Sequence, residues 1–113
     1  MLAGANRLVR ADDYRRLVRR GRRISTELAI VYVSHAASGE RVRFGFIVSK
    51  AVGGAVKRNL VRRRLKALSY ETLGTVEPGT DIVIRALPGA AQASWATLRS
   101  EISEVLPRGV TRE

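Results

Sequence analysis

The sequence predicts an α/β (α+β) fold, a two-layer sandwich in which helices cover one small mixed sheet. Helical and strand periodicities succeed one another along the chain in the order helix, strands, helix, strand, helix. Its 113 residues suit a single domain spanning residues 1–113, with fraying expected over about 1–6 and 108–113. Hydrophobic residues make up 45% of the chain, as is normal for a folded globular protein.

The N-terminal half is predicted to hold one helix and two strands. The helix covers 11–21, with acidic residues at its positive end, arginines at its negative end and a glycine stop. Residues 27–34 are apolar on both faces, which is typical of a strand covered on two sides. A turn over 35–40 leads to a second strand over 41–50. The residues that share one face of this second strand are Val42, Phe44, Phe46 and Val48.

The C-terminal half is predicted to alternate helix, strand and helix. A pair of glycines at 53–54 lets the chain turn into a helix over about 55–73, and a loop leads to a strand over 81–86. Ser94 can cap the last helix, which Pro107 should end. The apolar stripe of this helix comprises Trp95, Leu98, Ile102, Val105 and Leu106.

Charge is the unusual property of the chain. Lysine and arginine number 21 against 10 acids, which gives a net charge of +11 and predicts polyanionic partners, nucleic acid first and anionic membrane second. There are no cysteines, which excludes disulfides and thiolate metal sites and is compatible with the reducing cytoplasm, where we expect the protein. No apolar run approaches the roughly 20 residues that span a bilayer.

The helix over 55–73 concentrates this charge on one side. A helical wheel places Arg58, Asn59, Arg62, Arg63 and Lys66 on one face. The opposite face is apolar and comprises Val56, Leu60, Val61, Leu65, Ala67 and Leu68. Seven basic residues and no acid lie between positions 50 and 70. Like charges one turn apart cost a few tenths of a kcal/mol per pair, so an absent anion explains the pattern better than an ordinary solvated face does.

Other interpretations of this stretch fit less well. A phosphate-binding loop requires Lys-Ser/Thr directly after its second glycine, whereas Gly54 is followed by Ala-Val-Lys-Arg. A nuclear import signal matches only loosely. A membrane-surface helix would need bulky apolar or aromatic side chains at the interface. A DNA-binding module lacks a recognisable helix-turn-helix pair or zipper.

The stretch "RFGFIVSKAVGGAVKRNLVRRRLKAL" resembles the signature of the bacterial ribonuclease P protein subunit. The similarity continues at "NRL", "DDYRRLVRRGRR" and "DIVIRA" and in the closing amphipathic helix, so it covers nearly the whole chain. The resemblance implies a third strand before the arginine helix and the element order α-β-β-β-α-β-α. It also implies a left-handed βαβ crossover, like that in the second domain of a small-subunit ribosomal protein. The implied activity is assistance to a catalytic RNA that removes the 5′ leader of precursor tRNA.

The resemblance also assigns roles to residues. The family's Arg-Asn-Arg motif binds the RNA subunit; Arg58 and Asn59 match it, Leu60 replaces the third position, and neighbouring arginines can compensate. The implied RNA-subunit-binding set is Arg58, Asn59, Arg62, Arg63 and Lys66. The implied leader-binding cleft comprises Tyr14, Val18, Tyr32, Arg43 and Lys50. Core packing is the alternative for Tyr14 and Val18, since both share a helix face with Leu17.

Nothing in the residues suggests that the chain cuts RNA unaided. Its single histidine, His35, falls in a predicted turn, and Asp12 and Asp13 are explained by helix capping. We therefore expect no catalytic residue, metal ligand or organic cofactor in the protein. The resemblance implies that Mg²⁺ is held mainly by the RNA subunit and the substrate. The expected partners are ribonuclease P RNA and precursor tRNA, with no membrane and no required protein partner. A structural rRNA-binding protein without a role in cleavage remains the alternative.

Overall fold

A computed structural model describes residues 2–35 and 41–110. Its helices are α1 (Ala11–Arg20), α2 (Ala55–Thr72) and α3 (Trp95–Val110). Its strands are β1 (Arg22–Ser25), β2 (Ala29–His35), β3 (Arg43–Ile47) and β4 (Thr80–Ala86). Short 3₁₀ turns are η1 (Gly4–Asn6), η2 (Lys50–Val52), η3 (Leu73–Thr75) and η4 (Pro88–Ala91). The order α-β-β-β-α-β-α that the resemblance implied is thereby confirmed.

The four strands form one mixed sheet in the order β1-β2-β4-β3. The β1–β2 and β2–β4 pairs are antiparallel, whereas β3 and β4 are parallel and joined through α2. This connection is the βαβ crossover that the resemblance implied, and its left hand stays a prediction. The predicted mixed sheet covered by helices is confirmed.

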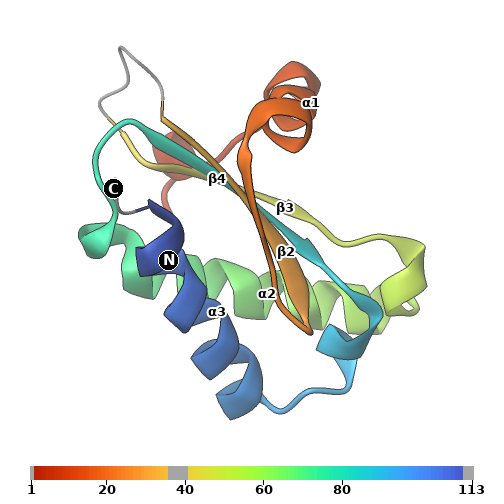
Figure 1. Ribbon diagram of the computed structural model, residues 1–113. Coiled ribbons are helices and arrows are strands. Elements are labelled where there is room, and N and C mark those ends of the chain that lie inside the picture. The colour runs from red at the N-terminus through yellow and green to blue at the C-terminus, as the bar shows by residue number, and fades with distance from the viewer. Residues whose placement is uncertain (1, 36–40, 111–113) are drawn as a thin grey trace.

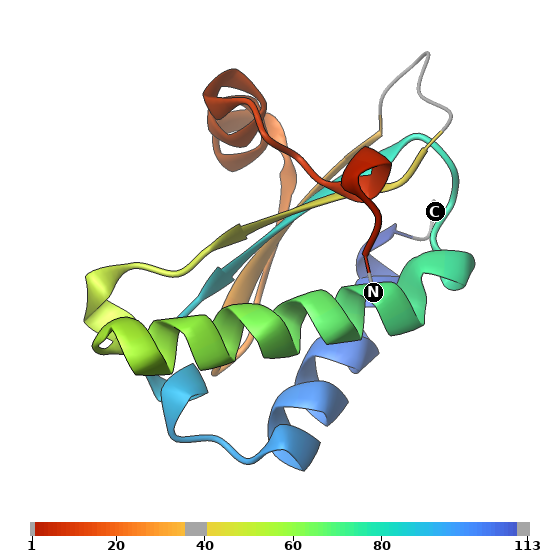
Figure 2. The same cartoon turned by 180° about the vertical axis from the view of Figure 1, so that it is seen from behind.

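The helices lie on opposite faces of the sheet. Figures 1 and 2 show α2 and α3 together on one face and α1 on the other face, over one end of the sheet. The register places Val33, Ile82 and Phe44 in one row on the α2 side, where they belong to the main hydrophobic core. On the α1 side, a smaller cluster comprises Leu8, Leu17, Tyr32 and Val83. The sheet is therefore covered on both sides where β2 crosses beneath α1, as predicted for this strand.

The last helix matches its prediction at its start and along its apolar stripe. The hydroxyl of Ser94 accepts a hydrogen bond from the Thr97 amide at 3.1 Å, which caps the first turn. Leu98, Ile102, Val105 and Leu106 are buried and Trp95 packs against them. The helix continues to Val110, so the predicted end at Pro107 was wrong. The fixed φ of proline is compatible with a helix, and its cost there is a missing backbone hydrogen bond and crowding of the preceding turn.

Several local predictions were wrong. Strand β1 was not assigned to any residues by periodicity, because only Ile24 in it is even partly buried. His35 ends β2 and contacts Thr80 Oγ1 through Nδ1 at 3.1 Å, whereas a turn was predicted there. The fraying expected over about 1–6 and 108–113 stays a prediction; in the structure Leu2 is buried and the Asn6 side chain donates a hydrogen bond to the Val42 carbonyl. The rest of the predicted turn, 36–40, and tail residues 111–113 lie outside the described residues.

The two glycines before α2 have different tasks. Gly53 has φ 151° and ψ −169°, a conformation that is essentially restricted to glycine. A Cβ added there would also lie 3.0 Å from the Lys57 side chain. Gly54 has φ −71° and open space around it, and it forms the N-cap of α2. The turn from β3 into α2 therefore depends on Gly53 but not on Gly54.

We expect Gly53→Ala to lower the free energy of unfolding by about 1–3 kcal/mol, because alanine is strained in this conformation. Gly54→Ser is the matched control and should leave stability unchanged or raise it by a few tenths of a kcal/mol, since serine is a good N-cap residue. Urea unfolding of both variants measures the difference. Equal stability of the two variants would contradict the assignment.

Candidate nucleic-acid interface

The cationic strip of α2, defined as Arg58, Asn59, Arg62, Arg63 and Lys66, lies opposite the packed side of the helix. Val61, Leu65 and Leu68 are fully buried beneath it, as the helical wheel predicts. Val56 and Ala67 are exposed, so their placement on the packed face was wrong. Both lie at the margins of the apolar arc, where the curved core of the domain does not reach. Within the strip, Arg58, Arg62 and Lys66 are half-buried, and Asn59 and Arg63 are exposed.

Hydrogen bonds order part of the strip. Arg62 Nη1 donates to Asn59 Oδ1 at 3.1 Å, so the only amide of the strip orients one of its guanidinium groups. Arg58 Nε is buried and has no hydrogen-bond partner within the described residues. Arg64, just outside the strip, donates to the Ala93 carbonyl at 3.1 Å and ties α2 to the segment before α3. The strip arginines thus keep most of their donors for an external acceptor.

The ion pairs identified within residues 2–35 and 41–110 do not include a residue of the strip. The arginines that they involve are Arg15, Arg16, Arg43 and Arg99. Guanidinium groups at one-turn spacing repel one another by a few tenths of a kcal/mol per pair when no anion lies between them. Phosphate groups of a polyanion would relieve this repulsion and accept the free donors.

A groove joins the strip to α1. This cavity of about 220 Å³ is lined on one side by Arg62 and Lys66 and on the other by Tyr14 and Arg7. Tyr14 belongs to the predicted leader-binding set and Arg62 to the predicted RNA-subunit-binding set. The structure therefore brings members of the two predicted sets to one continuous surface.

Tyr14 is fixed in place from two sides. Its hydroxyl donates to the Leu8 carbonyl and accepts from the Phe46 amide, both at 3.2 Å. Its ring lies directly on Gly45, where an added Cβ would come within 2.7 Å of the ring atoms. The ring stays half-buried at the groove, so Tyr14 combines a structural role with a position on the candidate surface.

The other predicted leader-binding residues are divided between core and surface. Tyr32 is only 4% exposed and packs with Leu17 and Val83, so its ring faces are occupied by the core between α1 and the sheet. Val18, in contrast, is 40% exposed on α1. Lys50 is exposed in η2. Stacking on Tyr32 is thus not supported by this structure, whereas Val18 and Lys50 remain accessible.

Arg43 is engaged by a buried carboxylate. Its Nε and Nη2 donate to the two carboxylate oxygens of Asp81 at 3.0 and 2.8 Å. Arg16 of α1 donates to the same carboxylate at 3.0 Å. The pKa of Arg43 is raised above its ordinary value, chiefly by its hydrogen bonds to Asp81, while partial burial opposes the rise. Arg43 therefore holds α1 to the sheet rather than extending towards a ligand.

A row of side chains beyond the end of α1 was not predicted. The register aligns Ile30, Arg85 and Ile47 across β2, β4 and β3 on the α1 side of the sheet. Arg85 is exposed between the two half-buried isoleucines. In the sequence Arg85 interrupts an apolar strand, and this interruption is the signal that could have identified it.

Within residues 2–35 and 41–110, no group of three or more His, Cys, Asp or Glu side chains converges on a common point. The same residues include no helix that is long and apolar enough to span a membrane. Fold and surface together define a small, basic domain of the α/β class with a cationic surface suited to a polyanion.

Comparison with known proteins agrees with this class. A family model described as Ribonuclease P matches residues 2–109. The "Ribonuclease P protein component" of Clavibacter michiganensis subsp. michiganensis is 52% identical over 110 residues, which cover 97% of each chain. That of Streptomyces bikiniensis is 44% identical over 116 residues, covering 96% of this chain and 94% of the relative. The chain therefore belongs to the family of ribonuclease P protein components.

Solved structures support the fold. The RNase P protein of Staphylococcus aureus superimposes with a TM-score of 0.85 at 21% identity, covering 94% of this chain and 98% of that one. The RNase P protein of Thermotoga maritima superimposes with a TM-score of 0.79 at 22% identity, covering 90% and 96%. The architecture is thus retained although roughly four in five aligned residues differ.

Proposed function

We propose that this protein is the protein subunit of a ribonuclease P ribonucleoprotein. It binds the catalytic RNA through the cationic strip of α2 and contacts the 5′ leader of precursor tRNA. In this way it assists the endonucleolytic removal of the leader that produces the mature 5′ end. The observation that carries the proposal is a strip of five polar residues, without an acid, on the exposed side of α2 in a chain of this family.

The strip acts by charge neutralisation. Each phosphate of single-stranded RNA that it contacts releases counterions, and log K then falls with log salt by about 0.7 per contact. Neutralised RNA strands repel each other less, so assembly needs less Mg²⁺. Arg58 and Arg62 supply planar donors that suit phosphate, and Asn59 orients Arg62.

The leader lies on the α1 side of the sheet in this proposal. Tyr14, Val18 and Lys50 stay in the binding set, because all three are at least partly accessible. Arg85 joins them as an exposed cation between two isoleucines. Apolar and aromatic surface accepts unpaired bases with little sequence preference, which suits leaders of variable sequence.

Cleavage itself is assigned to the RNA subunit. We place no Mg²⁺ ligand on this chain, because its described carboxylates are scattered or engaged with arginines. When bound to the RNA and the substrate, Mg²⁺ supplies the means of activating water and stabilising the leaving oxygen. The protein's residues bind and orient the two RNAs.

The experiment that tests the proposal mixes the protein with ribonuclease P RNA and precursor tRNA at a Mg²⁺ concentration too low for the RNA alone. Leader release should rise strongly above the RNA-only rate. Polyarginine of equal total charge is the control and should stimulate much less, because it lacks the ordered strip. Absence of stimulation, together with binding to rRNA fragments, would instead indicate a structural rRNA-binding protein.

A further inference from the structure

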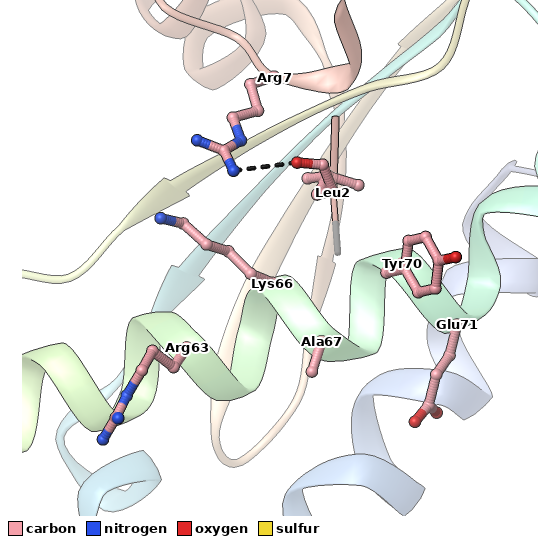
Figure 3. Close-up of a pocket in the computed structure, with 7 residues that line it drawn as sticks. All are labelled: Leu2, Arg7, Arg63, Lys66, Ala67, Tyr70 and Glu71. Atoms are coloured by element: carbon pink, nitrogen blue, oxygen red, sulfur yellow. Dashed lines mark hydrogen bonds between the residues drawn. The ribbon is translucent and has the colours of Figure 1, made fainter. Parts of the chain in front are cut away.

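A second cavity lies between the N-terminal segment and the C-terminal half of α2. Its volume is about 630 Å³, within the range of pockets that hold small organic ligands. In Figure 3, Lys66 extends from α2 towards Arg7, whereas the Tyr70 ring lies beside the helix with its hydroxyl directed away from Leu2 and Arg7. Arg7 and Lys66 also line the groove beside Tyr14, so the two hollows form one continuous surface.

Two cations point into the same space in this cavity. The guanidinium of Arg7 and the amine of Lys66 face one another in Figure 3. Arg7 Nη2 donates to the Leu2 carbonyl at 2.9 Å, while its Nε is buried without a partner among the described residues. Its backbone is fixed by pairing with Phe44 of β3. The arginine is therefore held next to a like charge by the fold, an arrangement that a shared anion would stabilise.

The one carboxylate at the cavity does not supply that anion. Glu71 lines it, but its carboxylate accepts a hydrogen bond from Arg99 Nε at 2.9 Å. In Figure 3 the Glu71 side chain extends away from Arg7 and Lys66. The charge of the Arg7–Lys66 pair is thus left for a ligand.

An aromatic ring lies one helical turn from this pair. Tyr70 is 52% exposed, although large aromatic side chains usually bury most of their surface. Its position four residues after Lys66 separates the two by about 6 Å along the helix axis. In Figure 3 the Lys66 amine points away from the Tyr70 ring, so a phosphate held by the pair and a base held by Tyr70 would belong to neighbouring nucleotides. Leu2 and the small Ala67 complete an apolar surface around the ring.

We propose that this cavity binds neighbouring nucleotides of the RNA subunit, with one phosphate between Arg7 and Lys66 and an adjacent base against Tyr70. The inference rests on the proposed function and extends the RNA-binding surface beyond the strip to the N-terminal segment. RNA fits the site better than an acidic peptide does, because a peptide carboxylate supplies charge without a planar ring for Tyr70.

The test measures binding of ribonuclease P RNA alone, without precursor tRNA, over a range of salt concentrations. Tyr70→Ala should weaken binding about 5- to 150-fold without changing the salt slope, because a stacked base carries no extra charge. Tyr70→Phe should bind like the wild type. Arg7→Gln should reduce the magnitude of the slope by about 0.7 to 0.9. Arg19→Gln, an exposed arginine of α1, is the matched charge control and should leave the slope unchanged.

Two failures can be told apart. If the wild type binds and stimulates cleavage while Tyr70→Ala and Arg7→Gln bind equally well, the nucleotide site is wrong and the proposed function stands. If the wild type does not bind the RNA, the proposed function fails and the site falls with it. Should thermal melting reveal that Arg7→Gln unfolds the protein, the exposed Tyr70 pair of variants decides alone.

Discussion

Asp81→Asn should lower the free energy of unfolding by about 2–4 kcal/mol. The Asp81 carboxylate is 1% exposed on β4 and binds Arg43 of β3 and Arg16 of α1, so three elements meet at one charge. Asparagine keeps the shape but removes the charge, and its amide nitrogen would face a guanidinium. Breaking a fully buried ion pair costs about 3–5 kcal/mol. The loss is smaller here because both arginines are more than a third exposed and regain water.

Asp12→Asn is the matched control for this change. Its carboxylate is 84% exposed and pairs with Arg15 on the surface of α1, so its loss should cost less than about 1 kcal/mol. Chemical unfolding at neutral pH measures both variants. A cost for Asp81→Asn no larger than that for Asp12→Asn would contradict the anchoring role of Asp81. Hydrogen exchange should in addition reveal faster opening of α1 in Asp81→Asn, because α1 loses the Arg16–Asp81 ion pair and keeps only the longer Arg43–Asp13 contact of 3.7 Å with the sheet.

The periodic elements of this fold could be predicted from the sequence because their residues carry a local signal. The α2 and α3 stripes repeat every three to four residues. Around β3, Val42, Phe44 and Val48 are buried in the main core and Phe46 packs against it, as their spacing of two predicts. Strand β1 has no such signal, since it is an edge strand whose exposed arginines are paired only through the backbone with β2. The family resemblance predicted that this strand exists, and the structure shows which residues form it.

The candidate site was predictable to a smaller extent, because its details depend on contacts between distant residues. Spacing within α2 was enough to define the cationic strip. No spacing could reveal that Asp81, 38 residues after Arg43, would occupy that arginine. Tyr32 lies in a strand that is apolar on both faces, so alternation could not decide between core and cleft. Arg7 and Tyr70 line one cavity only because the N-terminal segment packs beside α2.

The double variant Arg58→Ala and Arg62→Ala should weaken binding to ribonuclease P RNA about 30- to 1,000-fold at physiological salt. Two charge-assisted contacts are lost, at about 1–2 kcal/mol each. The magnitude of the salt slope should fall by about 1.4 to 1.8, since two phosphates are no longer neutralised. Arg15→Ala with Arg19→Ala removes the same charge from α1, on the other face of the sheet, and should change RNA-subunit affinity far less. Equal losses of RNA affinity in the two double variants would show that the strip contributes only through its net charge.

A substitution that adds a charge to α2 complements the double variant. Leu60→Arg supplies the arginine that the resemblance implies at this position, which lies on the other side of α2 from the strip. An increase of about 0.7 to 0.9 in the magnitude of the salt slope would show that RNA also contacts this side, provided that thermal melting shows the variant folded. For the Arg58→Ala and Arg62→Ala double variant, the free energy of unfolding should not fall together with the RNA affinity. Removing Arg58 and Arg62 relieves like-charge repulsion one turn apart, so the double variant should unfold no more easily than the wild type, apart from the packing lost at half-buried Arg58. Weaker binding without a loss of stability is the signature of residues retained for RNA rather than for the fold. A parallel loss of both would assign Arg58 and Arg62 to the structure of α2 instead.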